Sequence, residues 1–150
     1  ASRGCPYACT FCESKSMWTR KVRYRSPENI VNELKQLYKF GVRKVNFDDD
    51  TFGISKKNIK AMNDLMHDEL PNMTYTCETV VQLAKDEDVV KNMRKGGCTA
   101  TFVGIESGNN EILKKIKKTQ TTDECVQAME NLRKHGGYIP GIRPGDRTDL

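Results

Sequence analysis

Three cysteines lie close together near the start of the chain, at Cys5, Cys9 and Cys12. Their C-x3-C-x2-C spacing falls in a stretch that Gly4 and Pro6 keep from being a regular helix or strand. A loop of this kind can place three thiolates around one inorganic centre. A closed structural zinc site and a fully ligated iron–sulfur cube both take four ligands. On a four-iron cube, three thiolates would leave one iron open to a ligand from outside the protein.

The composition is that of an ordinary domain, because the 150 residues are 37% hydrophobic and 30% charged. No apolar run approaches the length of a membrane span, and no signal-like segment opens the chain. The remaining cysteines, Cys77, Cys98 and Cys125, are scattered through predicted strands and helices, so we expect small buried hydrophobic residues rather than ligands. A cluster of the predicted kind needs reducing conditions, so we expect a cytoplasmic protein.

The net charge of +5 is spread along the chain, and the densest basic run is Lys114, Lys115, Lys117 and Lys118. A solvated helix face and its end account for this run better than a nucleic-acid patch does. Binding to nucleic acid is therefore not indicated, although tRNA is not excluded as a substrate.

Helical and strand periodicities alternate along the chain. A capping serine and a proline at 26–27 begin the first helix, and a capping box at 121–124 begins the last. Helices are expected at about 27–40, 56–70, 86–95, 110–118 and from 122, and strands at 42–47, 74–78 and 99–105. Residues 13–25 are expected to form a loop. Strands that alternate with helices predict βα units and a parallel sheet.

The cysteine motif, with the aromatic Phe11 directly before the third cysteine, resembles that of the radical S-adenosylmethionine (radical SAM) enzymes. The resemblance continues through residues 23–31, 47–52 and 102–108, which look like the branch often preceded by a cobalamin-binding domain and related to the methylthiotransferases. In that superfamily the open iron is chelated by S-adenosylmethionine. One electron then cleaves the cofactor to methionine and a 5′-deoxyadenosyl radical.

The resemblance implies that residues 1–150 form a partial radical SAM core. Its fold would be an α/β, TIM-like partial (β/α)6 barrel with parallel strands, truncated at both ends so that the first and final strands are missing. The radical would serve methylation, methylthiolation or rearrangement of an unknown substrate. An electron donor such as flavodoxin or ferredoxin is implied. Cobalamin, where it is used, would be bound by a domain outside this chain.

Ligand-contacting residues of parallel α/β barrels cluster where the strands end. The resemblance implies that the three cysteines ligate the cluster. Phe11 would either shield the cluster, stack near the adenine or have only a packing role. Three aspartates follow the strand at 42–47, and one of them would accept a hydrogen bond from the cofactor ammonium. Asp49 is the favoured one; a turn or helix-capping role for the triplet is the alternative.

Two further strand ends carry acids. Glu78 follows the predicted strand at 74–78 and is either near the cofactor ribose or the substrate, or a solvated carboxylate. Glu106 and Ser107 lie in a glycine-flanked segment, where the backbone can approach a ligand closely, and would offer acceptors to the ribose or the methionine end. Lys118 lies about where related enzymes carry a basic residue for the cofactor carboxylate, but a surface lysine is the favoured interpretation.

The C-terminal stretch at 138–148 departs from the family pattern, since Pro140 stands where a central strand needs its N–H. A second hypothesis is a non-catalytic iron–sulfur or metal-binding electron-transfer module. It would close the site with a fourth protein ligand, for which Cys98 is the candidate.

Overall fold

The computed structural model describes residues 1–135. A three-stranded sheet has the order β3 (Lys44–Phe47), β4 (Thr74–Thr79), β5 (Cys98–Val103). Both strand pairs are parallel, with Val45 opposite Tyr75 and Cys77 opposite Thr101. The predicted parallel α/β fold is confirmed. The three strands do not close into a barrel within the described residues.

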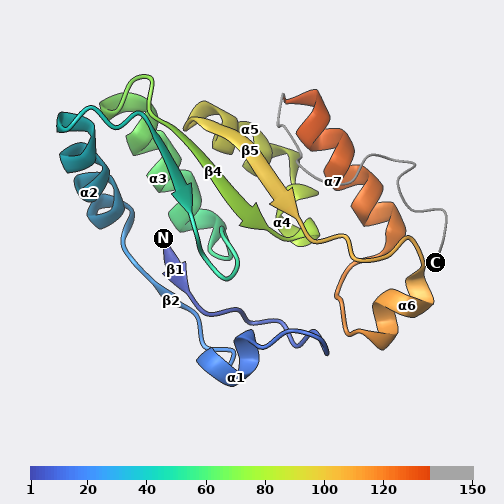
Figure 1. Ribbon diagram of the computed structural model, residues 1–150. Coiled ribbons are helices and arrows are strands. Elements are labelled where there is room, and N and C mark those ends of the chain that lie inside the picture. The colour runs from blue at the N-terminus through green and yellow to red at the C-terminus, as the bar shows by residue number, and fades with distance from the viewer. Residues whose placement is uncertain (136–150) are drawn as a thin grey trace.

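Helices of one to four turns connect the strands. The structure contains α1 (Ser14–Trp18), α2 (Pro27–Lys39), α3 (Lys56–Glu69), α4 (Val81–Ala84), α5 (Glu87–Lys95), α6 (Asn110–Lys115) and α7 (Thr122–Lys134). Helices α2, α3 and α5 lie on one side of the sheet, and α7 packs beside α4 and α5 (Figure 1).

Local capping sets where the main helices begin. The Ser26 hydroxyl accepts a hydrogen bond from the backbone N–H of Asn29 at 3.2 Å, with proline at the first helical position. Thr121 and Glu124 form a complete capping box at the start of α7. Both predicted helix starts are confirmed, because they depend on residues that are neighbours in the sequence.

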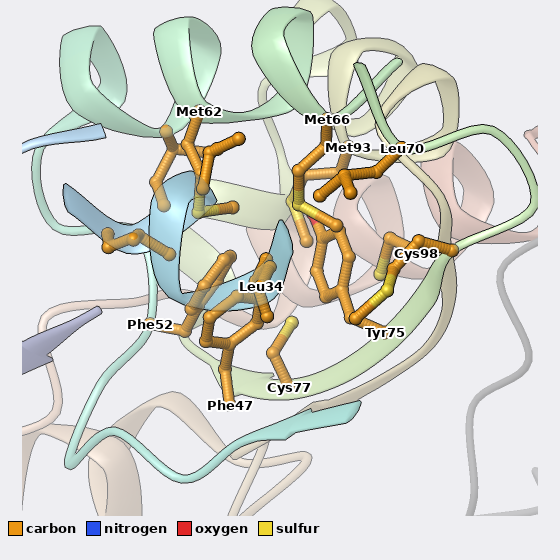
Figure 2. Packing of buried hydrophobic residues seen from close by; sticks show 14 of the residues in the cluster. Leu34, Phe47, Phe52, Met62, Met66, Leu70, Tyr75, Cys77, Met93 and Cys98 are labelled. Atoms are coloured by element: carbon orange, nitrogen blue, oxygen red, sulfur yellow. The ribbon is translucent and has the colours of Figure 1, made fainter. Parts of the chain in front are cut away.

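The hydrophobic core lies between the sheet and helices α2, α3 and α5. Three aromatic rings form its centre, with Phe47 5.1 Å from Phe52 and 5.2 Å from Tyr75 between ring centroids (Figure 2). Each fully buried large apolar side chain contributes roughly 1.5–3 kcal/mol to folding. The expected burial of the three scattered cysteines is confirmed, with relative exposures of 0% for Cys77, 3% for Cys98 and 6% for Cys125.

The other face of the sheet carries polar and exposed side chains. Along β4, Tyr75, Cys77 and Thr79 are buried while Glu78 is exposed. Thr76 donates a hydrogen bond to the Asn46 side chain of β3 at 2.7 Å on this second face. The side chains that alternate with the core residues therefore face away from the helices, as the pleat of a strand requires.

Two parts of the chain differ from the prediction. Residues 13–25 are not only a loop, because they contain α1 and the short strand β2 (Arg23–Tyr24), which pairs antiparallel with β1 (Ser2–Arg3). Helix α4 was not predicted. These elements are too short to carry a periodic pattern in the sequence. The expectation for 138–148, including Pro140, falls outside the described residues.

No helix in residues 1–135 is both long and apolar enough to cross a membrane.

Candidate cluster and cofactor site

A cavity of about 370 Å³ opens at the carboxyl ends of the parallel strands. The arrowheads of β3, β4 and β5 point toward the segment between β1 and α1, which lies with α6 beyond that end of the sheet (Figure 1). The cavity is lined by side chains from the cysteine loop, from the strand ends and from the segment after α6: Cys5, Tyr7, Cys9, Phe11, Cys12, Ser14, Asp50, Thr51, Glu78, Thr79, Val80, Phe102, Val103, Gly104, Glu106, Lys118, Thr119 and Gln120.

All three cysteines of the motif line this cavity as partly exposed free thiols. Their loop turns back on itself where the Cys12 N–H donates to the Cys9 carbonyl at 3.3 Å, and it docks on the end of α6 where the Thr10 N–H donates to the Ile116 carbonyl at 3.0 Å. Burial raises the pKa of the Cys9 thiol, and the nearby Lys118 ammonium opposes that rise.

The donor set fits a four-iron cluster better than it fits a single ion. Within residues 1–135, no three His, Cys, Asp or Glu side chains converge closely enough to hold one metal ion. A four-iron cube takes each thiolate on a different iron, so its three sulfurs need not meet at one point. Three free thiols around one cavity therefore fit the group that the sequence predicts.

Asp50 fastens the cysteine loop to the end of β3. Its carboxylate accepts hydrogen bonds from the Gly4 backbone N–H at 2.8 Å and from the Trp18 indole N–H at 3.0 Å. Gly4 has a φ of +95°, and a Cβ built there would lie 2.3 Å from the Lys21 carbonyl oxygen. Only glycine fits at this point of the loop.

Asp49 lies outside the cavity. Its carboxylate is buried, and one oxygen accepts hydrogen bonds from both the backbone N–H and the hydroxyl of Ser2, each at 2.7 Å. The other oxygen accepts from the Ala1 backbone nitrogen at 2.7 Å. Sequence reasoning favoured Asp49 as the cofactor contact, but Asp50 is the member of the triplet that lines the cavity.

Glu78 and Phe11 both line the cavity. The end of β4 that carries Glu78 is held in place because its carbonyl accepts from the Phe52 N–H at 2.9 Å, and the Thr79 hydroxyl donates to the Phe52 carbonyl at 2.8 Å. Phe11 is 56% exposed and Phe102 of β5 is 42% exposed, so both present apolar surface that the core does not use.

Glu106 and Lys118 form an ion pair in the cavity wall, with 3.1 Å between the carboxylate and the ammonium. The Lys118 ammonium also donates to the Gly104 carbonyl at 3.2 Å, and its side chain is only 10% exposed. The interpretation of Lys118 as a surface lysine is wrong, although Lys114, Lys115 and Lys117 are exposed as expected.

Ser107 is not among the residues that line the cavity. Its hydroxyl accepts a hydrogen bond from the Asn109 backbone N–H at 3.1 Å and so belongs to the turn that leads into α6. Ser107 is therefore not placed to make the cofactor contact that the sequence predicts.

Cys98 cannot close the site as a fourth ligand. It begins β5 and is buried in the core, whereas Val103 at the other end of the same strand lines the cavity. Five strand steps separate them by roughly 16 Å. The hypothesis of a closed metal site with Cys98 is therefore contradicted.

Sequence reasoning missed several other cavity residues, among them Tyr7, Thr51 and Gln120. Gln120 is buried and donates to the carbonyls of Gly104 and Ile105, both at 2.9 Å. Burial raises the pKa of the Tyr7 hydroxyl, and the neighbouring thiols add to that rise. Tyr7 and Thr51 adjoin the cysteine and aspartate motifs, and that proximity was the available signal.

Several proteins that are similar in sequence are named as methyltransferases or methylases. The uncharacterized methyltransferase PH0819 of Pyrococcus horikoshii is 34% identical over 141 residues, which is 93% of this chain and 30% of that protein. The hopanoid C-2 methylase of Rhodopseudomonas palustris is 31% identical over 160 residues, covering 99% of this chain and 29% of that protein. The chain thus spans less than a third of the length of these relatives.

Two solved structures share the fold at low sequence identity. The cobalamin-dependent S-adenosylmethionine radical enzyme OxsB, with aqua-cobalamin and S-adenosylmethionine bound, matches 92% of this chain and 22% of its own, with a TM-score of 0.81 and 21% identity. The radical S-adenosylmethionine methyltransferase TsrM from Kitasatospora setae, with cobalamin and a [4Fe-4S] cluster bound, matches 91% of this chain and 26% of its own, with a TM-score of 0.81 and 18% identity.

The sequence model of the radical SAM superfamily matches residues 1–143, a range that includes the cysteine loop and every residue of the cavity wall. With this match and the cavity geometry together, the chain belongs to the radical SAM superfamily.

Proposed function

We propose that this chain is the cofactor-cleaving core of a radical SAM enzyme. One observation carries the proposal: the three free thiols of the motif line the same cavity as strand-end acids and a buried lysine. Cys5, Cys9 and Cys12 would hold a [4Fe-4S] cluster. The cluster and S-adenosylmethionine, when bound, supply the one-electron cleavage that yields methionine and a 5′-deoxyadenosyl radical.

The cavity wall offers complementary groups for the carboxylate, the ammonium and the adenine of S-adenosylmethionine. Lys118 would bind the cofactor carboxylate, and Glu106 holds the lysine ammonium in the wall. Asp50 and Glu78 offer carboxylates to the cofactor ammonium, and such charge-assisted hydrogen bonds are strong. Phe11 and Phe102 offer apolar surface for the adenine and exclude water from it.

Among the reactions open to this superfamily, we propose methyl transfer for the whole protein. The relatives named above support this branch, since one is called a methyltransferase and the other a methylase. Cobalamin would be bound by a domain outside residues 1–150, because the sequence carries no recognisable cobalamin-binding motif. Methylthiolation and rearrangement are the competing reactions.

We propose an acidic one-electron carrier, such as flavodoxin or ferredoxin, as the electron donor. Support comes from exposed basic side chains on the α1–β2 segment: Lys15, Arg20, Lys21 and Arg23. Arg20 donates a hydrogen bond to the Pro6 carbonyl at 3.2 Å, one residue after the first cysteine. Opposite charge favours encounter with such a donor. Because a cluster of this kind needs reducing conditions, we also propose a cytoplasmic location.

The test is anaerobic iron–sulfur reconstitution of the full-length protein, followed by electron paramagnetic resonance of the reduced cluster with and without S-adenosylmethionine. A four-iron signal that changes when the cofactor is added, together with release of 5′-deoxyadenosine, supports the proposal. A four-iron signal that stays the same when S-adenosylmethionine is added overturns the proposal. The matched control is Cys125→Ala, which removes a buried non-ligand thiol and should leave the signal intact, whereas Cys9→Ala should abolish it.

A further inference from the structure

The hydroxyl of Thr51 lies against a sulfur of the cysteine loop. Its Oγ1 atom is 3.2 Å from the Sγ atom of Cys5, and the Thr51 residue is only 4% exposed. Thr51 follows the aspartate triplet at the end of β3, whereas Cys5 opens the cluster motif near the start of the chain. No other side-chain hydrogen bond within residues 1–135 reaches a sulfur of the motif cysteines.

The single proton of this hydroxyl has two possible acceptors. Besides the Cys5 sulfur, the Asp50 carbonyl oxygen lies 2.6 Å from Thr51 Oγ1. A cysteine that ligates iron has no S–H, so in the loaded protein only the hydroxyl can donate between these two residues. The more negative the sulfur becomes, the more strongly it competes with the carbonyl for this proton.

The surroundings hold Thr51 in place. The residue before it, Asp50, is tied to Gly4 at 2.8 Å, and the residue after it, Phe52, is fully buried and donates its backbone N–H to Glu78 at 2.9 Å. A donor fixed from both sides needs little reorganisation when the charge on the sulfur changes. The contact is therefore built into the strand end that positions the loop.

We propose that Thr51 is a positioning residue that sets the reduction potential of the cluster through its hydrogen bond to the Cys5 thiolate. Reduction adds one electron and converts [4Fe-4S]2+ to [4Fe-4S]+, which increases negative charge on the ligating sulfurs. A hydrogen-bond donor at a sulfur stabilises that charge and makes the cluster easier to reduce. The inference rests on the proposed function, because it requires that Cys5 ligates the cluster.

The test is a redox titration of the reconstituted full-length protein, with dithionite as the one-electron source and electron paramagnetic resonance as the readout. Thr51→Val removes the hydroxyl and keeps the branched shape, whereas Thr51→Ser restores a hydroxyl. The matched control is Thr101→Val, since the Thr101 hydroxyl lies 3.3 Å from the sulfur of Cys98, a cysteine of the core rather than of the cluster.

We expect Thr51→Val to disfavour cluster reduction by about tenfold, which is a shift of about 59 mV toward lower potential for one electron. Thr51→Ser should recover most of that shift, and Thr101→Val should leave the potential unchanged. Iron content per chain is measured for each variant, so that a lost cluster is not mistaken for a shifted one. An unshifted Thr51→Val cluster, or an equal shift in Thr101→Val, overturns the role of Thr51. A wild-type protein that assembles no four-iron cluster overturns the proposed function instead.

Discussion

The Asp50 carboxylate accepts a hydrogen bond from the Gly4 backbone N–H at 2.8 Å, one residue before the first cysteine of the motif. Three consecutive acids repel one another, so their presence needs a reason. Two of them bind the segment that precedes and begins the cluster loop, because Asp49 accepts from Ser2 while Asp50 accepts from Gly4 and Trp18. Positioning of the loop against β3 is therefore a function of Asp49 and Asp50.

Replacing Asp50 should weaken the cluster loop. Asp50→Ala leaves the N–H groups of Gly4 and Trp18 without their acceptor, and a lost hydrogen bond at such a solvent-accessible site costs about 0.5–1.5 kcal/mol. We expect a lower free energy of unfolding and less iron bound per chain after reconstitution. Asp48→Ala is the control, because within residues 1–135 no hydrogen bond joins the Asp48 side chain to the cysteine loop. Equal iron contents for the two variants would contradict the anchoring role of Asp50.

A side chain at Gly4 should be far more harmful than one at Gly41. Both glycines have positive φ, +95° and +87°, so alanine costs backbone strain of roughly 1–2 kcal/mol at each. At Gly4 the added Cβ would also lie 2.3 Å from the Lys21 carbonyl oxygen, whereas at Gly41 nothing lies within 4 Å. Thermal unfolding should show a larger loss for Gly4→Ala, and only this variant should lose iron. Similar melting temperatures for both would show that the loop can move away from Lys21.

Low pH should weaken the contact between helices α3 and α5. Hydrogen bonds from Lys60 and Lys95 lower the pKa of the Asp64 carboxyl below its ordinary value of 3.8. Because the folded-state pKa is the lower one, the stabilisation is fully present above about pH 4 and is lost as the pH falls through the folded-state value. Thermal unfolding between pH 6 and pH 2.5 should therefore depend less on pH in Asp64→Asn than in the wild type. Asp68→Asn, which changes an exposed aspartate of the same helix, should leave the pH dependence nearly unchanged.

Much of the fold could be predicted because its signals are local. The caps at Ser26 and Thr121 act on residues within the next turn, and the alternation of strands and helices implies a parallel sheet. The cysteine spacing likewise lies within one loop. These features need no knowledge of how distant segments pack, and the structure confirms the two caps and the parallel sheet.

The sequence-based assignments differ from the structure where a shift of one residue decides which side chain points into the cavity. Successive side chains at a strand end point to opposite sides, so Asp49 and Asp50 exchange roles if the phase is not known. Lys118 was grouped with its lysine neighbours as one helix face, but α6 ends at Lys115 and Lys117 adopts a φ of +57°. That turn directs Lys118 into the cavity wall, and no periodic pattern in the sequence predicts the turn.

Lys118 should determine the affinity for S-adenosylmethionine. Its ammonium is 3.1 Å from Glu106, and its side chain is mostly buried in the cavity wall, where it can meet the carboxylate of the cofactor. Lys118→Gln removes the charge, and a hydrogen bond to a charged group is worth about 1.5–3 kcal/mol, so the dissociation constant should rise about 10- to 100-fold. The affinity is read from the change that the cofactor causes in the paramagnetic resonance signal of the reduced cluster.

Lys117→Gln is the matched control for this prediction, because Lys117 is the exposed neighbour of Lys118 and carries the same charge. It should bind the cofactor as the wild type does, and both variants should keep the wild-type iron content, since neither lysine ligates the cluster. If both variants weaken binding equally, the effect comes from the net charge around the cavity rather than from a contact with Lys118. If Lys118→Gln binds with wild-type affinity, the cofactor carboxylate lies elsewhere in the cavity and the assignment of Lys118 is wrong.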